Sequence, residues 1–179
     1  MIDHQTKGFR QMKERFGEIY REYESAIYGY LFYMTQEEQT AQDLSQETFL
    51  KIYLGYKKIR EESCLKAWCM TIARNTFLSY ARKKKPFLLG DEAIYSQIPA
   101  SEPSPEAIIL QSERRREIQE LLLKLNESDR TVLILRDYEG LSYADIAGVM
   151  GLTEPVVKVR IYRARTRLKK LYETEVGRM

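Results

Sequence analysis

Hydrophobic positions in the first 86 residues recur at intervals of three to four, and no proline occurs before Pro86. This pattern is typical of α-helices that bury one face. It predicts three helices, over about residues 9–34, 36–58 and 64–85. We expect Thr35 to cap the second helix, because a threonine hydroxyl can accept from a backbone N–H of the first turn. Pro86 should end the third helix, because proline lacks a backbone donor.

Four of the five prolines lie within residues 86–105, which predicts a linker. The charge distribution agrees with this division. Residues 1–86 carry 15 basic and 11 acidic side chains, residues 87–113 carry five acids and no Lys or Arg, and residues 114–179 carry 14 basic and 10 acidic side chains. Two basic blocks joined by an acidic segment indicate two surfaces for a polyanion and a spacer that does not bind it. The predicted fold is all-α, with two small helical domains (1–86 and 114–179) joined by a flexible linker (87–113).

The second domain contains a helix-turn-helix pattern. A helix over about 128–138 should end at Gly140, and Ser142 with Asp145 has the spacing of a capping box. The short helix Tyr143 to Met150 should stop at Gly151, which can adopt the left-handed conformation without a Cβ clash. Thr153 then begins another helix. A helix, a tight glycine turn and a second helix make up the DNA-binding motif.

The last helix, about 154–170, carries seven basic residues and one acid, Glu154. Its apolar residues Val157, Ile161, Ala164 and Leu168 fall on one stripe. Mutual repulsion among so many cations would be relieved by a phosphate backbone, so this helix is predicted to bind DNA. We expect Lys158, Val159, Tyr162 and Arg163 to contact bases. Phosphate contacts are expected from Arg165, Arg167 and Lys169.

Three sequence runs together carry a resemblance to a known family. The first is D-L-S-Q-E-T-F at residues 43–49, the second is W-x-x-x-I-A-R-N at residues 68–75, and the third is the helix-turn-helix L-S-Y-x-D-I-A at residues 141–147, followed by V-K-x-R-x-x-R-A-R at residues 157–165. In this order and across a linker, they make the chain resemble an extracytoplasmic-function (group four) sigma factor of bacterial RNA polymerase. The resemblance covers about residues 16–86 and 115–172.

The resemblance implies a role for each matched group of residues. The surface for the polymerase β′ coiled coil would consist of Asp43, Leu44, Gln46, Glu47 and Phe49. The minus-ten element would be bound by Trp68, Arg74, Asn75, Arg82 and Lys83, with Lys84 and Lys85 beside them. The minus-thirty-five element would be bound by Lys158, Val159, Tyr162, Arg163 and Arg165. The implied partners are core RNA polymerase, through β′ and the β subunit, promoter DNA, and an anti-sigma factor.

Other classes of function find little support in the sequence. The single histidine is His4, and no glycine-rich phosphate loop, G-x-S-x-G or H-E-x-x-H motif occurs, so we expect no catalytic residues. We expect no metal site and no cofactor. Cys64 and Cys69 are interpreted as reduced core residues of a cytoplasmic protein. No run approaches the length of a membrane span, so no direct membrane insertion is expected. The alternative function is a helix-turn-helix regulator that acts without polymerase, which would not need the runs at 43–49 and 68–75.

Overall fold

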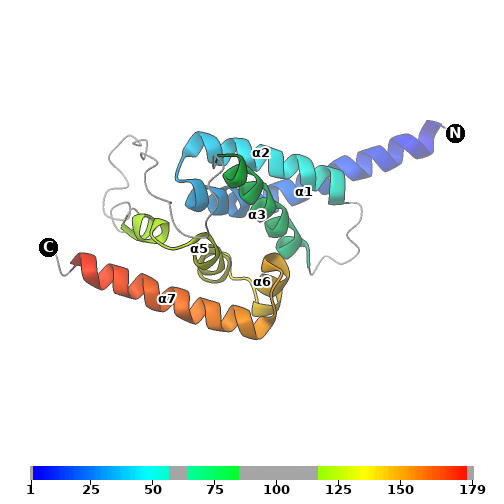
Figure 1. Ribbon diagram of the computed structural model, residues 1–179. Helices are drawn as coiled ribbons and strands as arrows, with labels where there is room; N and C mark the ends of the chain where they lie inside the picture. The colour runs from blue at the N-terminus through cyan, green and yellow to red at the C-terminus, as the bar shows by residue number, and fades with distance from the viewer. Residues whose placement is uncertain (1, 57–63, 85–116, 177–179) are drawn as a thin grey trace.

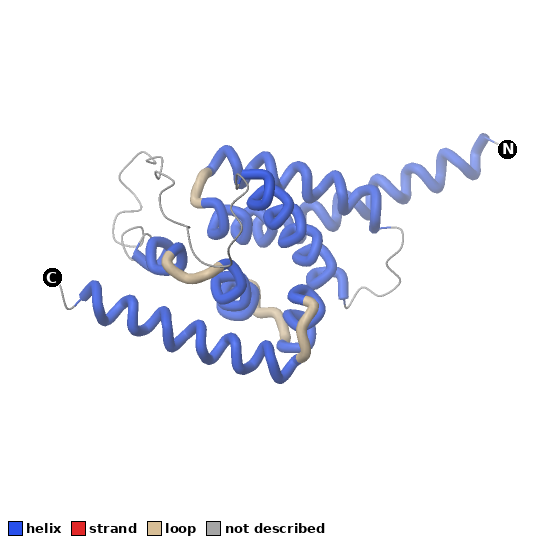
Figure 2. Tube along the Cα trace, viewed as in Figure 1, coloured by secondary structure: helices blue, strands red, loops and turns tan. Residues whose placement is uncertain are grey.

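The computed structural model describes residues 2–56, 64–84 and 117–176, with side chains described from residue 13 to residue 175 within these ranges. Its helices are α1 (Ile2–Thr35), α2 (Glu38–Gly55), α3 (Leu65–Lys84), α5 (Glu127–Leu133), the π-helical turn η3 (Ile134–Tyr138), α6 (Tyr143–Met150) and α7 (Glu154–Val176), with a further helical stretch at 117–123. The described residues contain no strand (Figure 2), which confirms the all-α prediction. The predicted linker and the proline-rich segment within it lie outside the described residues.

The helices form two groups that pack against each other (Figure 1). Helices α1, α2 and α3 contact one another and form the N-terminal domain. In the C-terminal domain, α7 starts beside α6 and runs along α5. Helix α3 also packs against α6, so a helix of each domain meets the other.

The first two helices differ from their predicted limits. Helix α1 starts at Ile2 and runs to Thr35, where Gln36 adopts a left-handed φ of 56° and stops it. The prediction that Thr35 caps α2 was wrong, because the capping position is Glu37. The Thr35 hydroxyl instead donates to the Leu31 carbonyl at 2.9 Å. It therefore supplies a hydrogen-bond donor to the last turn of α1 and does not cap the first turn of α2.

The helix-turn-helix forms as its local sequence predicts. The side chain of Ser142 accepts from the Asp145 N–H at 3.0 Å, and the Asp145 carboxylate accepts from the Ser142 N–H, so the capping box is complete. Gly140 (φ 68°) and Gly151 (φ 65°) both occupy the left-handed region. The helix preceding Gly140 ends in the π-helical turn η3, which the sequence pattern did not predict.

The apolar stripe of α7 is buried, as predicted. Val157, Ile161 and Ala164 are almost completely buried, and Leu168 packs against the core.

The two cysteines differ from each other in burial. Cys69 is buried, and burial raises the pKa of its thiol to about 12, whereas Cys64 is exposed and is not the core residue that we expected.

The two domains share one continuous hydrophobic core and several polar contacts. The buried hydroxyls of Tyr30 and Thr131 are hydrogen-bonded at 3.2 Å. Lys66 donates to the Glu139 carbonyl at 2.6 Å and forms an ion pair with its carboxylate at 3.2 Å. The rings of Tyr33 and Tyr138 pack with their centroids 4.8 Å apart. The C-terminal domain is therefore fixed against α1 and α3 in this arrangement.

Arg130 is the largest fully buried side chain at this junction. Its guanidinium donates to the carbonyls of Leu122 (2.9 Å), Leu123 (2.9 Å) and Leu125 (3.1 Å), where the helix at 117–123 ends. It also donates to the Met34 carbonyl at 3.2 Å, in the last turn of α1. Carbonyls at helix ends lack donors within their own helix. Arg130 therefore supplies the missing donors at the ends of two helices, one from each domain.

We expect Arg130→Met to lower the free energy of unfolding by about 3 kcal/mol or more. Methionine fits the volume but leaves buried carbonyls without a donor, at about 1–3 kcal/mol each. Urea denaturation followed by circular dichroism measures the change. Arg163→Met, at an exposed arginine, is the control and should change stability by less than about 0.5 kcal/mol. Equal stability of the two variants would contradict this role of Arg130.

Candidate nucleic-acid and protein interfaces

Helix α2 divides the residues of the 43–49 run between surface and core. Asp43, Gln46 and Glu47 are exposed, whereas Leu44 and Phe49 are buried in the N-terminal domain. Period 3.6 puts these two sets on different faces of the helix. A partner that docks on α2 can therefore reach the three polar side chains directly, while the two apolar ones hold the helix in place.

Two exposed leucines extend this surface. Leu50 is 60% exposed and Leu54 is 71% exposed, and they follow Asp43 and Glu47 at helical spacings of three and four. We call Asp43, Gln46, Glu47, Leu50 and Leu54 the α2 outer face. Sequence reasoning missed both leucines, although their heptad spacing from Asp43 and Glu47 was a usable signal. Large apolar side chains left exposed next to charged ones are typical of a protein-binding surface.

The polar part of the α2 outer face is ordered by neighbouring side chains. Gln39 donates to the Asp43 carboxylate at 3.0 Å. Lys51 forms an ion pair with Glu47 at 2.6 Å and also donates to the Thr76 hydroxyl of α3 at 3.0 Å. The position of Glu47 is therefore coupled to α3, the helix that carries the 68–75 run.

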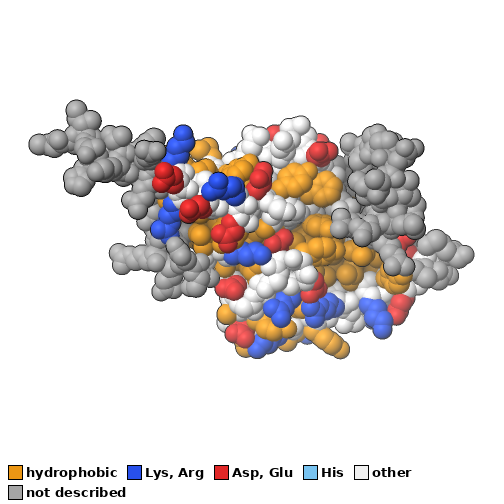
Figure 3. All heavy atoms as spheres, turned by 180° about the vertical axis from the view of Figure 1, so that it is seen from behind, with side chains coloured by type: hydrophobic (Ala, Val, Ile, Leu, Met, Phe, Trp, Pro, Cys, Tyr) orange, Lys and Arg blue, Asp and Glu red, His pale blue; other side chains and the backbone are white. Residues whose placement is uncertain are grey.

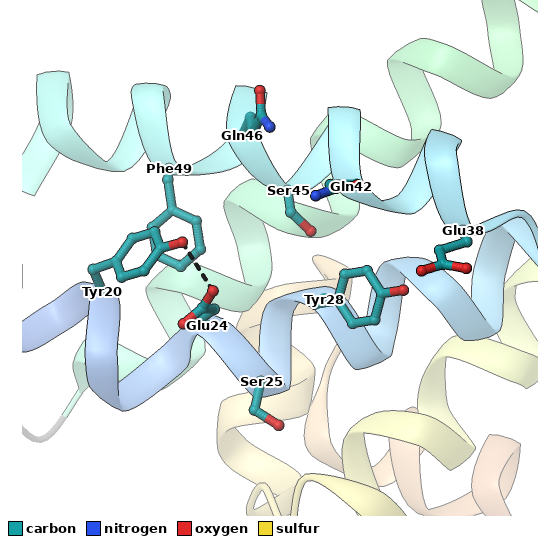
Figure 4. Close-up of a pocket in the computed structure, with 9 residues that line it drawn as sticks. All are labelled: Tyr20, Glu24, Ser25, Tyr28, Glu38, Gln42, Ser45, Gln46 and Phe49. Carbon is teal, nitrogen blue, oxygen red and sulfur yellow. Dashed lines mark hydrogen bonds between the residues drawn. The ribbon is translucent and has the colours of Figure 1, made fainter.

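A groove of about 430 Å³ runs beside this face between α1 and α2. Figure 4 shows the nine residues that line it, and none of them is a lysine or an arginine. It contains two carboxylates, Glu24 and Glu38, and the aromatic rings of Tyr20, Tyr28 and Phe49. Burial and then the charge of Glu38 raise the pKa of Tyr28. The groove therefore suits a cationic side chain.

Helix α3 presents only part of its predicted set to solvent. Asn75, Arg82 and Lys83 are exposed. Trp68 is half-buried against the end of α2, where a Cβ at Gly55 would lie only 3.0 Å from its ring. Arg74 faces the C-terminal domain, and its Nε lies 3.3 Å from the Glu127 carboxylate.

Helix α7 exposes every residue that was predicted to contact the minus-thirty-five element. Tyr162 is 73% exposed, and Lys158, Val159, Arg163 and Arg165 are also exposed. They lie outside the buried stripe of α7, which consists of Val157, Ile161 and Ala164. The helix therefore has one face in the core and one available to a ligand.

The cations of α7 are matched by acids far more than its sequence indicates. Lys158 is paired with Glu154 at 2.8 Å, Arg160 and Arg167 with Asp129, Arg165 with Asp137, and Lys169 with Glu173 at 3.7 Å. Basic and acidic side chains are likewise interspersed on the face shown in Figure 3. Within the described residues, Arg163 and Lys170 have no acidic partner. The predicted crowding of one sign was therefore wrong, because α5 and η3 supply two of the acids.

The described residues contain no cluster of three or more metal-ligating side chains. In the same part of the chain, no helix combines the length and the hydrophobicity needed to cross a bilayer.

Comparison with known proteins identifies both halves of the chain. The family model for Sigma-70 region 2 matches residues 19–87, and the model for Sigma-70, region 4 matches residues 115–168. The RNA polymerase sigma factor YlaC of Bacillus subtilis (strain 168) is 32% identical over 161 residues, which cover 86% of this chain and 89% of that protein. The ECF RNA polymerase sigma factor SigM of the same organism is 33% identical over 161 residues, covering 89% and 96% of the two chains.

Solved structures agree with this assignment. The sigma factor RpoE from Bartonella quintana, in complex with the anti-sigma factor NepR, matches with a TM-score of 0.65 and 26% identity, covering 92% of this chain and 98% of that one. CnrH, in complex with the cytosolic domain of CnrY, shares the fold with a TM-score of 0.67 at 21% identity, over 90% of both chains. With both sigma regions matched and relatives more than 30% identical along most of their length, the chain belongs to the extracytoplasmic-function class of RNA polymerase sigma factors.

Proposed function

We propose that the chain binds core RNA polymerase through the α2 outer face and directs it to promoters through α3 and α7. The observation that carries this proposal is the alignment of Leu50 and Leu54 with the exposed Asp43 and Glu47 on one helix face. The two leucines form an apolar patch that continues the face beyond the acids, and protein interfaces combine apolar and polar area in this way. The acidic groove beside it, with Glu24 and Glu38, would receive a cationic side chain of the polymerase β′ coiled coil.

Two elements of the promoter would be bound by different domains. Residues 1–86 would act as region two and residues 114–179 as region four, with 87–113 as the linker between them. On α3, Asn75 has an exposed amide that suits an unstacked base, and Arg82 and Lys83 suit the adjacent backbone. On α7, Arg163 suits guanine, and Val159 and Tyr162 suit a thymine methyl group. The pairs of Lys158 and Arg165 are exposed and therefore weak, so phosphates can displace their acids.

Simultaneous binding of two separated promoter elements would require the domains to move apart. In this structure α3 packs against α6, and Arg74 is paired with Glu127 of the C-terminal domain. A DNA phosphate and Glu127 would compete for the same guanidinium. We therefore propose that the domains separate when polymerase and promoter bind.

The same surfaces would be open to regulation by an anti-sigma factor. The related sigma factor RpoE was solved in complex with the anti-sigma factor NepR. We propose an anti-sigma partner for this chain as well, and we place its action in the cytoplasm, where polymerase and promoter DNA are found. The chain would supply binding rather than catalysis, and it would need no cofactor. The match to region 2 favours this function over that of a regulator that acts without polymerase.

We expect Asp43→Ala/Glu47→Ala and Leu54→Ser each to weaken binding to core polymerase by about tenfold or more, because each removes part of a compact interface. Fluorescence anisotropy of the labelled chain titrated with core polymerase measures this. Glu18→Ala/Glu22→Ala removes two exposed acids at the same spacing from α1 and should have no effect. Equal affinity of all variants would rule out the α2 outer face as the docking site.

We expect Arg163→Ala in the reconstituted holoenzyme to lower discrimination between promoters by about 1–3 kcal/mol, because a bidentate contact to guanine is lost. Promoter selection from a randomised duplex library, compared with the wild type, measures the change position by position. Binding to polymerase should remain intact. A loss of affinity that is uniform across all promoter sequences would show that Arg163 contacts phosphate only.

We expect fluorescence transfer between the domains to fall when core polymerase and promoter-bearing DNA bind. A donor on the exposed Cys64 and an acceptor on Gly148→Cys report on the α3 and α6 contact, since a Cβ at Gly148 meets no atom within 4 Å. Cys69 should stay unlabelled, because its thiol is buried and has a raised pKa. Unchanged transfer on formation of the complex would contradict domain separation.

A further inference from the structure

Asp129 is an unusual carboxylate, because its side chain is only 2% exposed although it lies beside α7, the helix proposed to bind the minus-thirty-five element. Both of its oxygens have partners. Oδ1 lies 3.5 Å from Arg160 Nη1, and Oδ2 accepts from Asn126 Nδ2 at 3.1 Å and from Arg167 Nη1. The Asp129 N–H donates to the Asn126 side chain at 2.8 Å, which fixes the start of α5. Two guanidinium groups of α7 thus converge on one buried acid of another helix.

Burial makes this pairing different from the other ion pairs of α7. An exposed pair contributes about 1 kcal/mol or less, so a phosphate group easily replaces its acid. A buried carboxylate that loses its partners becomes an unpaired charge in a medium of low polarity, which costs several kcal/mol. Arg160 and Arg167 are therefore held more firmly than Lys158, Arg165 or Lys169, whose acids are at least one-third exposed.

The same acid borders the surface where DNA would lie. Asp129 and both of its arginines line a hollow of about 520 Å³, together with Val156, Val159 and Arg163. Arg163 projects into this hollow from α7 and has no acidic partner among the described residues. The hollow therefore carries one arginine that is available to DNA and two that are engaged by Asp129.

We propose that Asp129 is a specificity-determining residue, which holds Arg160 and Arg167 off the phosphate backbone and leaves Arg163 as the arginine of this hollow that contacts DNA. Cations released toward phosphates strengthen binding to every sequence alike, whereas contacts to bases discriminate. By engaging two cations, Asp129 lowers the non-specific component and raises the relative weight of base readout. This inference rests on the proposed function of α7 and changes the role expected for Arg167 from its sequence.

The salt dependence of DNA binding distinguishes engaged from available arginines, since each neutralised phosphate contributes about 0.9 to the slope of log K against log salt concentration. The experiment compares holoenzymes reconstituted with the full-length wild type, Arg163→Gln and Arg167→Gln. The probe is a fluorescent 40-base-pair duplex, about four helical turns, of mixed sequence. On this duplex, which is not a selected promoter, we expect Arg163 to lie against a phosphate, so Arg163→Gln should reduce the slope by about 0.9 and Arg167→Gln should leave it unchanged.

A second set of variants removes the acid itself. Asp129→Asn keeps the shape of the side chain but lacks its charge, so it should release both arginines and steepen the slope by up to about 1.8. Adding Arg160→Gln/Arg167→Gln to Asp129→Asn should return the slope to the wild-type value. Circular dichroism reports whether Asp129→Asn folds, and if it does not, the comparison of Arg163→Gln with Arg167→Gln decides alone. A purely structural role for Asp129 would lower the melting temperature without steepening the slope.

Two results would overturn the inference. An equal loss of slope in Arg167→Gln and Arg163→Gln would show that Arg167 already contacts phosphate. An unchanged or shallower slope in folded Asp129→Asn would show that the acid does not restrain these arginines. If neither arginine changes the slope, Arg163 does not contact DNA either, and the inference falls together with the role proposed for Arg163.

Discussion

The structure depends on how the buried guanidinium of Arg130 is satisfied. Its donors reach carbonyls at the ends of two helices, Leu122, Leu123 and Leu125 in the C-terminal domain and Met34 in the N-terminal domain. A buried charge of this kind is tolerated only when its hydrogen bonds are complete. The first turn of α5 is therefore fixed against α1. Thr131, the next residue, bonds to Tyr30 across the same junction.

Fixing this turn also determines which cations of α7 are paired with acids. Asp129 immediately precedes Arg130, and Glu127 lies two residues before Asp129. One turn of α5 thus reaches Arg74 on α3 and Arg160 and Arg167 on α7. The helices proposed to bind the two promoter elements meet at the same few acidic residues. Electrostatic competition between these acids and DNA phosphates links the arrangement of the domains to DNA binding.

Local sequence signals predicted the helix-turn-helix well. The capping box of Ser142 and Asp145, the left-handed glycines and the buried stripe of α7 depend only on residues a few positions apart. The non-local features were not predictable in this way. Asp129 and Arg130 look like ordinary charged residues on a helix, and only the fold shows that both are buried. For the same reason, the cations of α7 appeared unbalanced, because the acids that match Arg165 and Arg167 come from a segment about 30–40 residues earlier.

The candidate polymerase surface on α2 contains both residues that the sequence indicated and residues that it missed. The resemblance indicated a segment of α2, and burial separates its exposed Asp43 and Glu47 from Leu44 and Phe49 in the core. Leu50 and Leu54 fell outside the matched run, although they lie on the same face. The identity of an apolar residue does not tell whether it packs in the core, and only the heptad spacing from Asp43 and Glu47 indicated that the two leucines are exposed. In the structure of α2, both leucines are exposed.

The most direct test of the account is transcription in vitro by bacterial core polymerase, with and without the purified chain, on fragmented genomic DNA from the source bacterium. Mapping of RNA 5′ ends is the readout. We expect new start sites that depend on the chain and share two upstream sequence elements at a constant separation. Binding to core polymerase without any such start sites would contradict it.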